Sequence, residues 1–349
     1  EMSNLKTRSK RWLAAFGLSL LSVQAASAET LTDALISAFN HSGLLEQNRA
    51  LLRAADEDVA IATAALRPIL NYTGTLSRNF ARTTNHTSGR LSENNSTTVT
   101  VGIAAELLLY DGGQSRFAIE AAKESVLSAR AQLLSIEQSV LLRAIQAYMN
   151  VRRSIETVAL RQSNVRLITQ ELRAARDRFE VGEITRTDVA LAEARLASSR
   201  SGLAAAQGAL IQAQEEYRAS VGRKPGNLIA PKNLPKTASS VDKAKSIAVR
   251  NHPDMHAIQH DVAAADLNVL RANAAMSGTV KLSGGLNRTE TPSANTSTNA
   301  GSVSLQAVIP IYQGGRLSAL HRQAIARRDA ARGGLHGTRH QIQQNVGNA

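Results

Sequence analysis

Hydrophobic and polar residues alternate along four separate segments of the chain. In 69–80, Leu70, Tyr72 and Leu76 alternate with Asn, Thr and Ser, and 98–109 shows the same alternation, broken only by Leu108. A period of two indicates strands with one apolar and one polar face. We therefore predict four strands, joined in pairs by polar loops at 81–96 and 289–301: 69–80, 98–110, 279–288 and 302–312.

Strands of this length fit two settings. One is a half-buried sheet in a soluble domain, and the other is a transmembrane β-barrel, whose strands need about 9–11 residues. Tyr72, Tyr110 and Tyr312 stand at strand ends, as in an aromatic girdle at a membrane interface. The pattern leaves both settings open. In a barrel, the polar face would line the lumen with Asn71, Thr73, Thr75, Thr98, Thr100, Glu106, Lys281, Ser283 and Ser304.

Heptad spacing predicts two very long helices. No Pro or Gly occurs between Gln114 and Phe179, a stretch that amounts to about 100 Å of helix at 1.5 Å per residue. Small and apolar residues such as Ala144, Ala147, Val151 and Leu172 recur there in a 3-4 spacing, and a matching seam that includes Leu196 follows the next turn. We predict an antiparallel coiled-coil hairpin of a long helix over 114–180 and a returning helix over 187–220.

The stretch EVGEITRTD joins these two helices. Gly182 can take the left-handed position that ends the first helix. Thr185 or Thr187 can cap the second helix, and Asp188 is favourable in its first turn. The sequence therefore predicts a tight turn at the far end of the hairpin.

The order of these elements occurs twice. The stretch ELLLYDGG resembles AVIPIYQGG, and each precedes a long Ala-rich, charged segment. A repeat of this length indicates a duplicated domain. Glycine lacks a Cβ and therefore suits the sharp change of direction from strand to helix. The two junctions are Tyr110, Gly112 and Gly113, and Tyr312, Gly314 and Gly315.

The repeat divides the chain into segments. The first repeat spans 29–222 and opens with helices over 30–67, and a connector with three Pro follows at 223–240. The second repeat spans 241–349, opens with helices over 242–277, and ends with the start of a long helix at 315–349. About 74 fewer residues follow Gly315 than follow Gly113 within its repeat, so the repeat logic predicts that the second copy is incomplete.

Residues 1–28 have the pattern of a secretory signal peptide. A basic stretch ends at Arg11, an apolar run extends from Trp12 to Val23, and Ala26-Ser27-Ala28 completes the pattern. We predict cleavage before Glu29 and export from the cytoplasm. The chain contains no Cys, so no disulfide framework is expected.

Composition and motifs argue against two other classes of function. The net charge is +13, but the basic residues are dispersed and aromatic residues make up only 3%, which argues against nucleic-acid binding. His252, His256 and His260 share a spacing that a metal site could use, but a solvated helix face explains it better. No catalytic set, phosphate loop or cofactor fingerprint stands out. We expect neither an enzyme, nor a cofactor, nor a metal.

The stretch RFEVGEITRTDVALAEARLASSRSGLAAAQGALIQAQEEYRASVG resembles the helix–turn–helix of the TolC family of outer-membrane efflux proteins. The family pattern is a Phe-x-x-Gly, a Thr-Asp past the turn, an Ala-Glu, and a closing Val-Gly. These positions are occupied here by Phe179, Gly182, Thr187, Asp188, Ala192, Glu193, Val221 and Gly222. The resemblance covers essentially the whole chain after residue 28.

The resemblance implies a mostly helical fold with a transmembrane β part. Each protomer of the family adds four strands to a trimeric, 12-stranded outer-membrane β-barrel, which continues into a long coiled-coil α-barrel in the periplasm. Such a protein is the exit duct of a tripartite efflux pump or type I secretion system in a Gram-negative cell. It is a passive conduit, and it carries no nucleotide site of its own.

The resemblance also implies partners. They are two further copies of the chain, outer-membrane lipid, a periplasmic membrane-fusion adaptor and, indirectly, an inner-membrane transporter of RND or ABC type. The adaptor would contact the hairpin tip at Val181, Gly182, Glu183, Ile184, Thr187 and Asp188. The family's second hairpin, which holds the inner gate, has no counterpart in this sequence. The alternative from another class is a periplasmic or surface coiled-coil scaffold or adhesin without channel activity.

Overall fold

The computed structural model describes residues 29–231 and 235–349, so the predicted signal peptide lies outside the described residues. The chain forms two compact units. One contains the residues up to Gly43 together with Glu137–Lys236, and the other contains Leu44–Ile136 and Thr237–Ala349. The division falls inside the longest helix, α3 (Gln114–Glu180).

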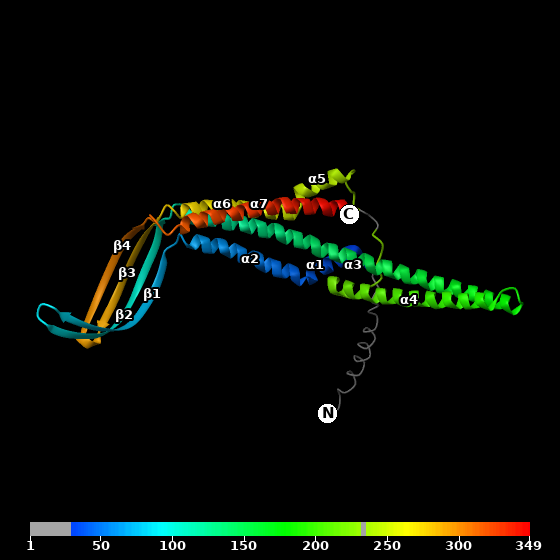
Figure 1. Cartoon of the computed structure of the whole chain (residues 1–349), viewed down its shortest axis with the longest axis horizontal. Coiled ribbons are helices and arrows are strands. Elements are labelled where there is room, and N and C mark those ends of the chain that lie inside the picture. Colours follow the sequence, from blue (N-terminus) through cyan, green and yellow to red (C-terminus); the bar gives the residue numbers. More distant parts are fainter. Residues whose placement is uncertain (1–28, 232–234) are drawn as a thin grey trace, which may run out of the picture. The chain divides into compact units, whose positions relative to one another are not determined.

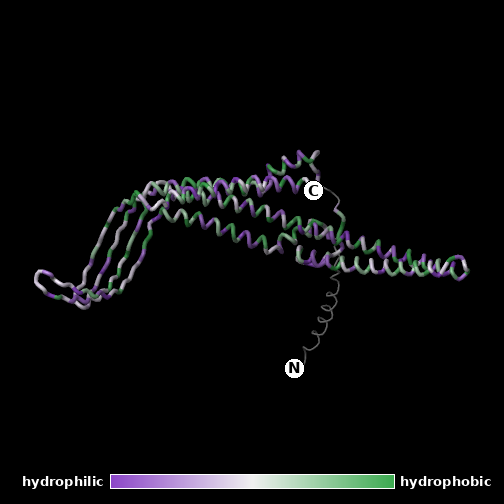
Figure 2. The backbone as a smooth tube through the Cα atoms, in the orientation of Figure 1, coloured by the Kyte–Doolittle hydropathy of each residue, from purple (hydrophilic) through white to green (hydrophobic). Residues whose placement is uncertain are grey.

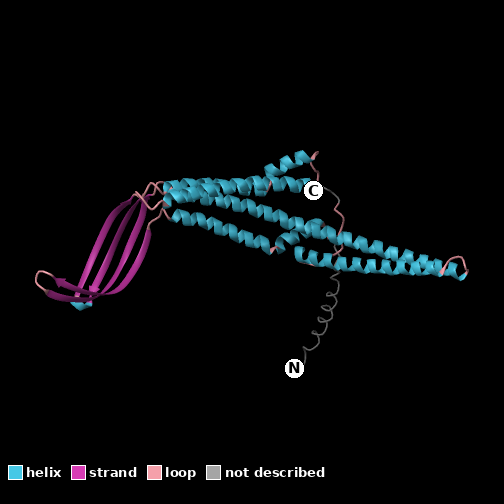
Figure 3. Ribbon diagram, in the orientation of Figure 1, coloured by secondary structure: helices cyan, strands magenta, loops and turns pink. Residues whose placement is uncertain are grey.

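The second unit contains a four-stranded antiparallel sheet. Its strands lie side by side in chain order, β1-β2-β3-β4 (Figures 1 and 3). Every neighbouring pair is antiparallel, and β1 and β4 are the two edges. The strands are β1 (Ile69–Asn85), β2 (Arg90–Tyr110), β3 (Thr279–Thr291) and β4 (Thr296–Val308).

The β1–β2 hairpin is longer than the polarity of its sequence indicated. The predicted loop at 81–96 is mostly a continuation of the ladder, in which Arg82 lies opposite Glu93 and pairs with it. Polar residues keep the alternation here, because cross-strand pairs of polar and charged groups also stabilise a ladder. The loop prediction was therefore wrong for most of this segment.

The second hairpin also differs from its prediction. The short 3₁₀ helix η1 (Pro292–Ala294) and Asn295, with a φ of 48°, form its turn, so most of the predicted loop at 289–301 is strand. β4 ends at Val308, whereas the sequence predicted a strand to 312. Pro310 explains this end, because proline has no N–H to donate to the ladder.

Four further helices and the N-terminal part of α3 belong to the second unit, and the ends of α6 follow from local sequence. His252 caps α6 and precedes Pro253 at its first position, where proline suits a helix start. α6 and α7 are joined by an ion pair of 3.1 Å between Asp266 and Arg332. The helices are α2 (Gly43–Ala64), α5 (Val241–Asn251), α6 (Pro253–Ala274) and α7 (Arg316–Asn348).

The first unit is a helical hairpin with a short helix packed near its base. It consists of α1 (Leu31–His41), the C-terminal part of α3 and α4 (Arg186–Val221). Polar pairs join α3 to α4 along their length, at Arg143–Glu216, Asn164–Ser199 and Arg176–Glu193. The core is made largely of small residues, which allow close helix packing: Ala34, Ala38, Ala144, Ala147, Tyr148, Val151, Tyr217 and Val221.

The seam predicted from heptad spacing is partly confirmed. Ala144, Ala147, Val151 and Leu172 are buried on α3 at the expected positions, and so is Leu196 on α4.

None of the helices in 29–231 and 235–349 has both the length and the apolar character that a bilayer span requires.

Candidate functional site

The register of the sheet brings the nine polar strand positions together. Directly opposite residues of an antiparallel ladder share a face. Thr75 lies opposite Thr100, which lies opposite Thr289, and hydroxyl hydrogen bonds follow this row, with 3.0 Å between Thr100 and Thr289. Ser283 and Ser304 form a similar pair at 2.8 Å. All nine predicted lumen residues therefore share one face, although the surroundings of that face remain a prediction.

The other face of the sheet is apolar and exposed. Leu70, Tyr72, Leu286 and Val303 are 70%, 75%, 71% and 82% exposed. Figure 2 shows the alternation along each strand as a succession of green and purple segments. An apolar surface of this extent indicates a contact with lipid or with another protein.

One ion pair interrupts the small, neutral side chains of the polar face. Lys281 Nζ lies 2.6 Å from Glu106 Oε1, across the β2–β3 ladder. Close to it, the register shifts between Leu108 and Tyr110, which indicates a β-bulge. Leu108 precedes the bulge and lies opposite Lys281, so it is an apolar side chain on the otherwise polar face.

The two strand–helix junctions share backbone geometry but differ in their caps. Gly112 and Gly113 have φ of +69° and +88°, and Gly314 and Gly315 have +59° and +81°. The Asp111 carboxylate accepts hydrogen bonds from Gly113 N at 3.0 Å and from Ser115 N at 2.6 Å, and so caps α3. The helix α7 has no side-chain cap. The sequence analysis missed the role of Asp111, although an acid just before a helix is a recognisable sign.

Gly112→Ala should destabilise the protein more than Gly314→Ala. Both glycines have positive φ, so each alanine carries a strain of about 1–3 kcal/mol. A Cβ on Gly112 would also lie 2.8 Å from Ala274 O and 2.7 Å from Ser277 Cβ, whereas Gly314 has open space. Thermal unfolding followed by circular dichroism measures the difference. Equal losses in Tm would contradict the close approach at Gly112.

The turn between α3 and α4 is closed by backbone and side-chain caps. Gly182 has a φ of +81°, and its N donates to Phe179 O at 3.0 Å. Thr185 is the N-cap of α4 and forms a capping box with Asp188, which resolves the choice between Thr185 and Thr187. The hydrogen bond from the Thr185 side chain lowers the pKa of Asp188.

The six predicted adaptor residues lie in this turn and the first turn of α4. Thr187 belongs to α4 and is not its cap. Val181 is 72% exposed, and Ile184 is half-buried. Glu183 forms an ion pair of 3.0 Å with Arg178. The turn therefore presents one strongly exposed apolar side chain on a well-capped backbone.

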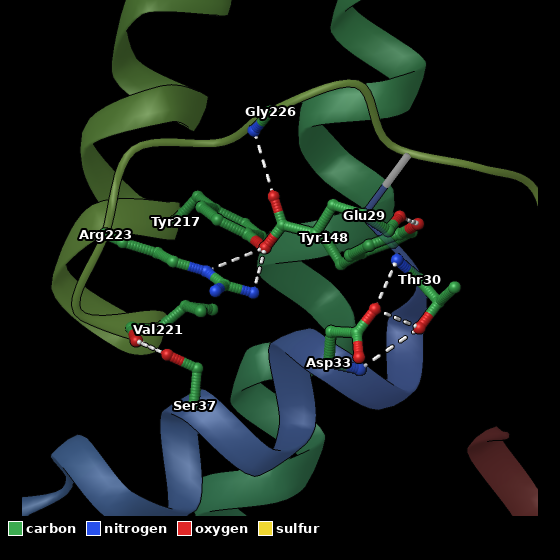
Figure 4. Close-up of polar contacts among 9 residues, drawn as sticks. All are labelled: Glu29, Thr30, Asp33, Ser37, Tyr148, Tyr217, Val221, Arg223 and Gly226. Carbon is green, nitrogen blue, oxygen red and sulfur yellow. Dashed lines mark hydrogen bonds and ion pairs between the residues drawn. The ribbon is translucent and has the colours of Figure 1, made fainter. Parts of the chain in front are cut away.

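A buried carboxylate near the base of the hairpin was missed by the sequence analysis. Glu29 is 8% exposed, and its side chain accepts hydrogen bonds from Tyr217 at 2.5 Å, Arg223 at 3.0 Å and Gly226 N at 2.9 Å (Figure 4). The Tyr148 hydroxyl lies 2.9 Å from the Glu29 carbonyl oxygen. This cluster ties residue 29 and the connector to both long helices.

The environment of the cluster shifts the acidity of its tyrosines. Burial, and then the hydrogen bond to Glu29, raises the pKa of Tyr217 far above its ordinary value. Burial also raises the pKa of Tyr148. Both phenols therefore stay protonated at neutral pH and act as hydrogen-bond donors. The partners are up to 197 residues apart, so no local spacing could reveal them.

The histidines that share a helical spacing have separate roles. His252 Nδ1 accepts from Asp254 N at 3.1 Å and caps α6. His260 lies 2.7 Å from Glu124 of α3, so it is not part of a purely solvated face. Within 29–231 and 235–349, no three His, Asp or Glu residues are grouped as a metal site would require.

Comparisons with known proteins give one family match and two relatives of known name. The family model described as Outer membrane efflux protein matches residues 35–223 and 245–349. The chain is 36% identical over 310 residues to outer membrane efflux protein BepC of Brucella suis biovar 1 (strain 1330), which covers 87% of this chain and 65% of BepC. It is 24% identical over 282 residues to outer membrane protein TolC of Vibrio cholerae serotype O1 (strain ATCC 39315 / El Tor Inaba N16961), covering 78% of this chain and 62% of TolC. The chain thus spans less than two thirds of either relative.

Solved structures share the fold. The outer membrane protein VceC of Vibrio cholerae matches with a TM-score of 0.73 and 21% identity, over 89% of this chain and 75% of VceC. A membrane protein from Pseudomonas aeruginosa matches with a TM-score of 0.77 and 21% identity, over 89% of this chain and 74% of that protein. Because the family model matches most of the sequence and BepC is 36% identical, the chain belongs to the TolC family of outer membrane efflux proteins and is an outer-membrane protein.

Proposed function

We propose that this chain is a protomer of a trimeric outer-membrane exit duct. The observation that carries the proposal is the sheet, which has one polar face, one exposed apolar face and two unpaired edges. In a barrel, the apolar face contacts lipid and the polar face lines a water-filled lumen. A soluble scaffold would leave the apolar face without a partner.

The open edges require several copies to associate. In lipid, each unpaired backbone group of an open sheet costs several kcal/mol, so only closed barrels persist there. Four strands are too few to close a barrel, but rotational symmetry can pair β1 of one copy with β4 of the next. Three copies supply 12 strands, the number that the family resemblance implies.

The duct serves a tripartite efflux pump or a type I secretion system, in line with the name of BepC, an outer membrane efflux protein. It acts as a passive conduit through the periplasm and outer membrane, without catalysis or a cofactor. A periplasmic adaptor contacts the hairpin tip, and an inner-membrane transporter supplies the energy. In an efflux pump the duct would carry small solutes, and in a type I secretion system it would carry secreted polypeptides.

Cysteine crosslinking in outer membranes tests the trimer. Residues 1–349 contain no Cys, so introduced pairs give disulfides without background from this part of the chain. Cysteines scanned in β1 around Thr75 and in β4 around Ser302 of the full-length protein should form a disulfide-linked ladder that ends at three chains. The control pair is Thr100→Cys with Thr289→Cys, which are neighbours within one sheet and should give only monomers. Monomers from every edge pair would refute the proposal.

A further inference from the structure

The polar face of the sheet carries a single, mutually neutralising pair of charges. At the polar-face positions of the four described strands, the ionisable side chains are Arg90, beside the β1–β2 turn, and the pair Glu106 and Lys281. The remaining positions there are mainly Thr, Ser, Asn, Gln, Gly and Ala. Every polar-face position of β2 between Arg90 and Glu106 is neutral, so the pair determines the charge of the part of the face that surrounds it.

The exposure of the pair argues against a role in stability. The side chains of Lys281 and Glu106 are 45% and 48% exposed. Pairs that exposed contribute about 0–1 kcal/mol. Cross-strand Thr and Ser pairs already connect β2 to β3 and β3 to β4. Each of the two charges therefore acts mainly through the electrostatic potential above this surface. Together the two charges cancel, and removal of either one leaves the other uncompensated.

We propose that Glu106 and Lys281 each cancel the charge of the other on the lumen wall, so that anionic and cationic solutes pass this level of the duct alike. This inference rests on the proposed barrel, in which three copies would place three such pairs around the lumen. Loss of one partner would leave a ring of three like charges. Such a ring attracts solutes of opposite charge and repels those of like charge, most strongly at low salt.

A reporter cysteine on the same face measures this potential. Ser304 lies opposite Ser283, which lies opposite Glu106, so Ser304→Cys stands close to the pair. In the full-length protein in outer membranes, this single cysteine is labelled with an anionic and a cationic methanethiosulfonate reagent. The ratio of the two labelling rates is the readout, and it is insensitive to changes in overall accessibility.

The labelling ratio is compared in the parent, the two single Gln variants and the double Gln variant. Relative to the parent, Glu106→Gln should shift the ratio about threefold towards the anionic reagent at 10 mM salt, where the Debye length is about 30 Å. Lys281→Gln should shift it about threefold towards the cationic reagent. The double variant should restore the parental ratio, although it lacks the ion pair. All shifts should disappear at 1 M salt, where the Debye length is about 3 Å.

Two further changes separate selectivity from structure. Gln306→Glu and Gln306→Lys add a charge opposite Lys281 while the pair stays intact, and they should shift the ratio in opposite directions. They keep the inference testable even where a single Gln variant fails to assemble. An unchanged ratio in every charge variant overturns the inference, as does a double variant that differs from the parent.

A failure of the barrel itself has another outcome. Leu305→Cys, on the apolar face, should react slowly with both charged reagents. If Leu305→Cys reacts readily and Ser304→Cys does not, the assignment of the two faces is wrong, and the proposed duct fails with it. If Ser304→Cys reacts as expected but the ratio of its two labelling rates is the same in every charge variant, the proposed duct is retained and only the selectivity inference is overturned.

Discussion

Val303→Arg is expected to prevent stable assembly in the outer membrane. Val303 is 82% exposed on the apolar face, in the row that also contains Ala105 and Leu70. In the proposed barrel Val303 faces lipid, where arginine costs up to about 2–4 kcal/mol per site at mid-membrane depth. Three copies would each carry this penalty. The measurements are the amount of trimer in outer membranes and its resistance to heat in detergent.

Ser304→Arg is the matched control, because it places the same side chain one residue along the same strand, on the opposite face. A water-filled lumen should accept it at far lower cost, and the trimer should form in nearly normal amounts. Leu305→Arg returns to the apolar face and should resemble Val303→Arg. Equal tolerance at Val303 and Ser304 would refute the assignment of the two faces.

Val181→Asp is expected to abolish export while the trimer still forms. Val181 is 72% exposed in a turn whose backbone is held by its own caps, so its side chain contributes little to the hairpin. In the proposed complex it meets the adaptor, where an unpaired charge in an apolar contact costs several kcal/mol. Ile184→Asp should act in the same direction. Accumulation of a pump substrate in cells that lack the native gene measures export.

Glu215→Gln is the control for a change of charge on the same hairpin, away from the turn. It removes an exposed ion pair with Arg218 that contributes at most about 1 kcal/mol, so export should persist. Full export by Val181→Asp, with normal amounts of trimer, would mean that the adaptor contacts another surface.

Asp188 distinguishes a structural role from a contact role at the same turn. Its pKa is lowered in the folded state by the Thr185 side chain, so its capping contribution is complete at neutral pH and is lost as the pH falls through the folded pKa. Asp188→Ala should therefore lower stability at neutral pH and remove that acid-dependent loss. If it abolished export without lowering stability, Asp188 would belong to the adaptor contact.

Local sequence determined the features that depend on periodicity. A period of two assigned Thr100 and Ser304 to one face and Val303 to the other, because side chains must alternate along any extended strand. A 3-4 spacing of small residues located the buried seam at Ala144, Ala147 and Val151. The Gly-Gly pairs marked the junctions, since positive φ suits glycine.

Strand ends were harder to predict, because polarity alone does not distinguish a loop from a ladder. Residues 81–96 have the composition of a loop, but opposite partners such as Arg82 and Glu93 stabilise them as strand. The partner strand supplies this stabilisation, so it depends on register. At the other end, Pro310 stops β4 for a local reason that the alternation of its neighbours concealed.

Only the tertiary structure revealed the two polar clusters that join distant segments. Glu29 meets Tyr217 and Arg223 nearly two hundred residues along the chain, and Lys281 meets Glu106 across 175 residues. Periodicity describes which way a side chain points within its own element, but it carries no information about what lies opposite. The sequence by itself therefore determined the elements and their faces. The pairing of those faces decided where the charges are neutralised, because electrostatic interaction depends on distance in space and not on separation along the chain.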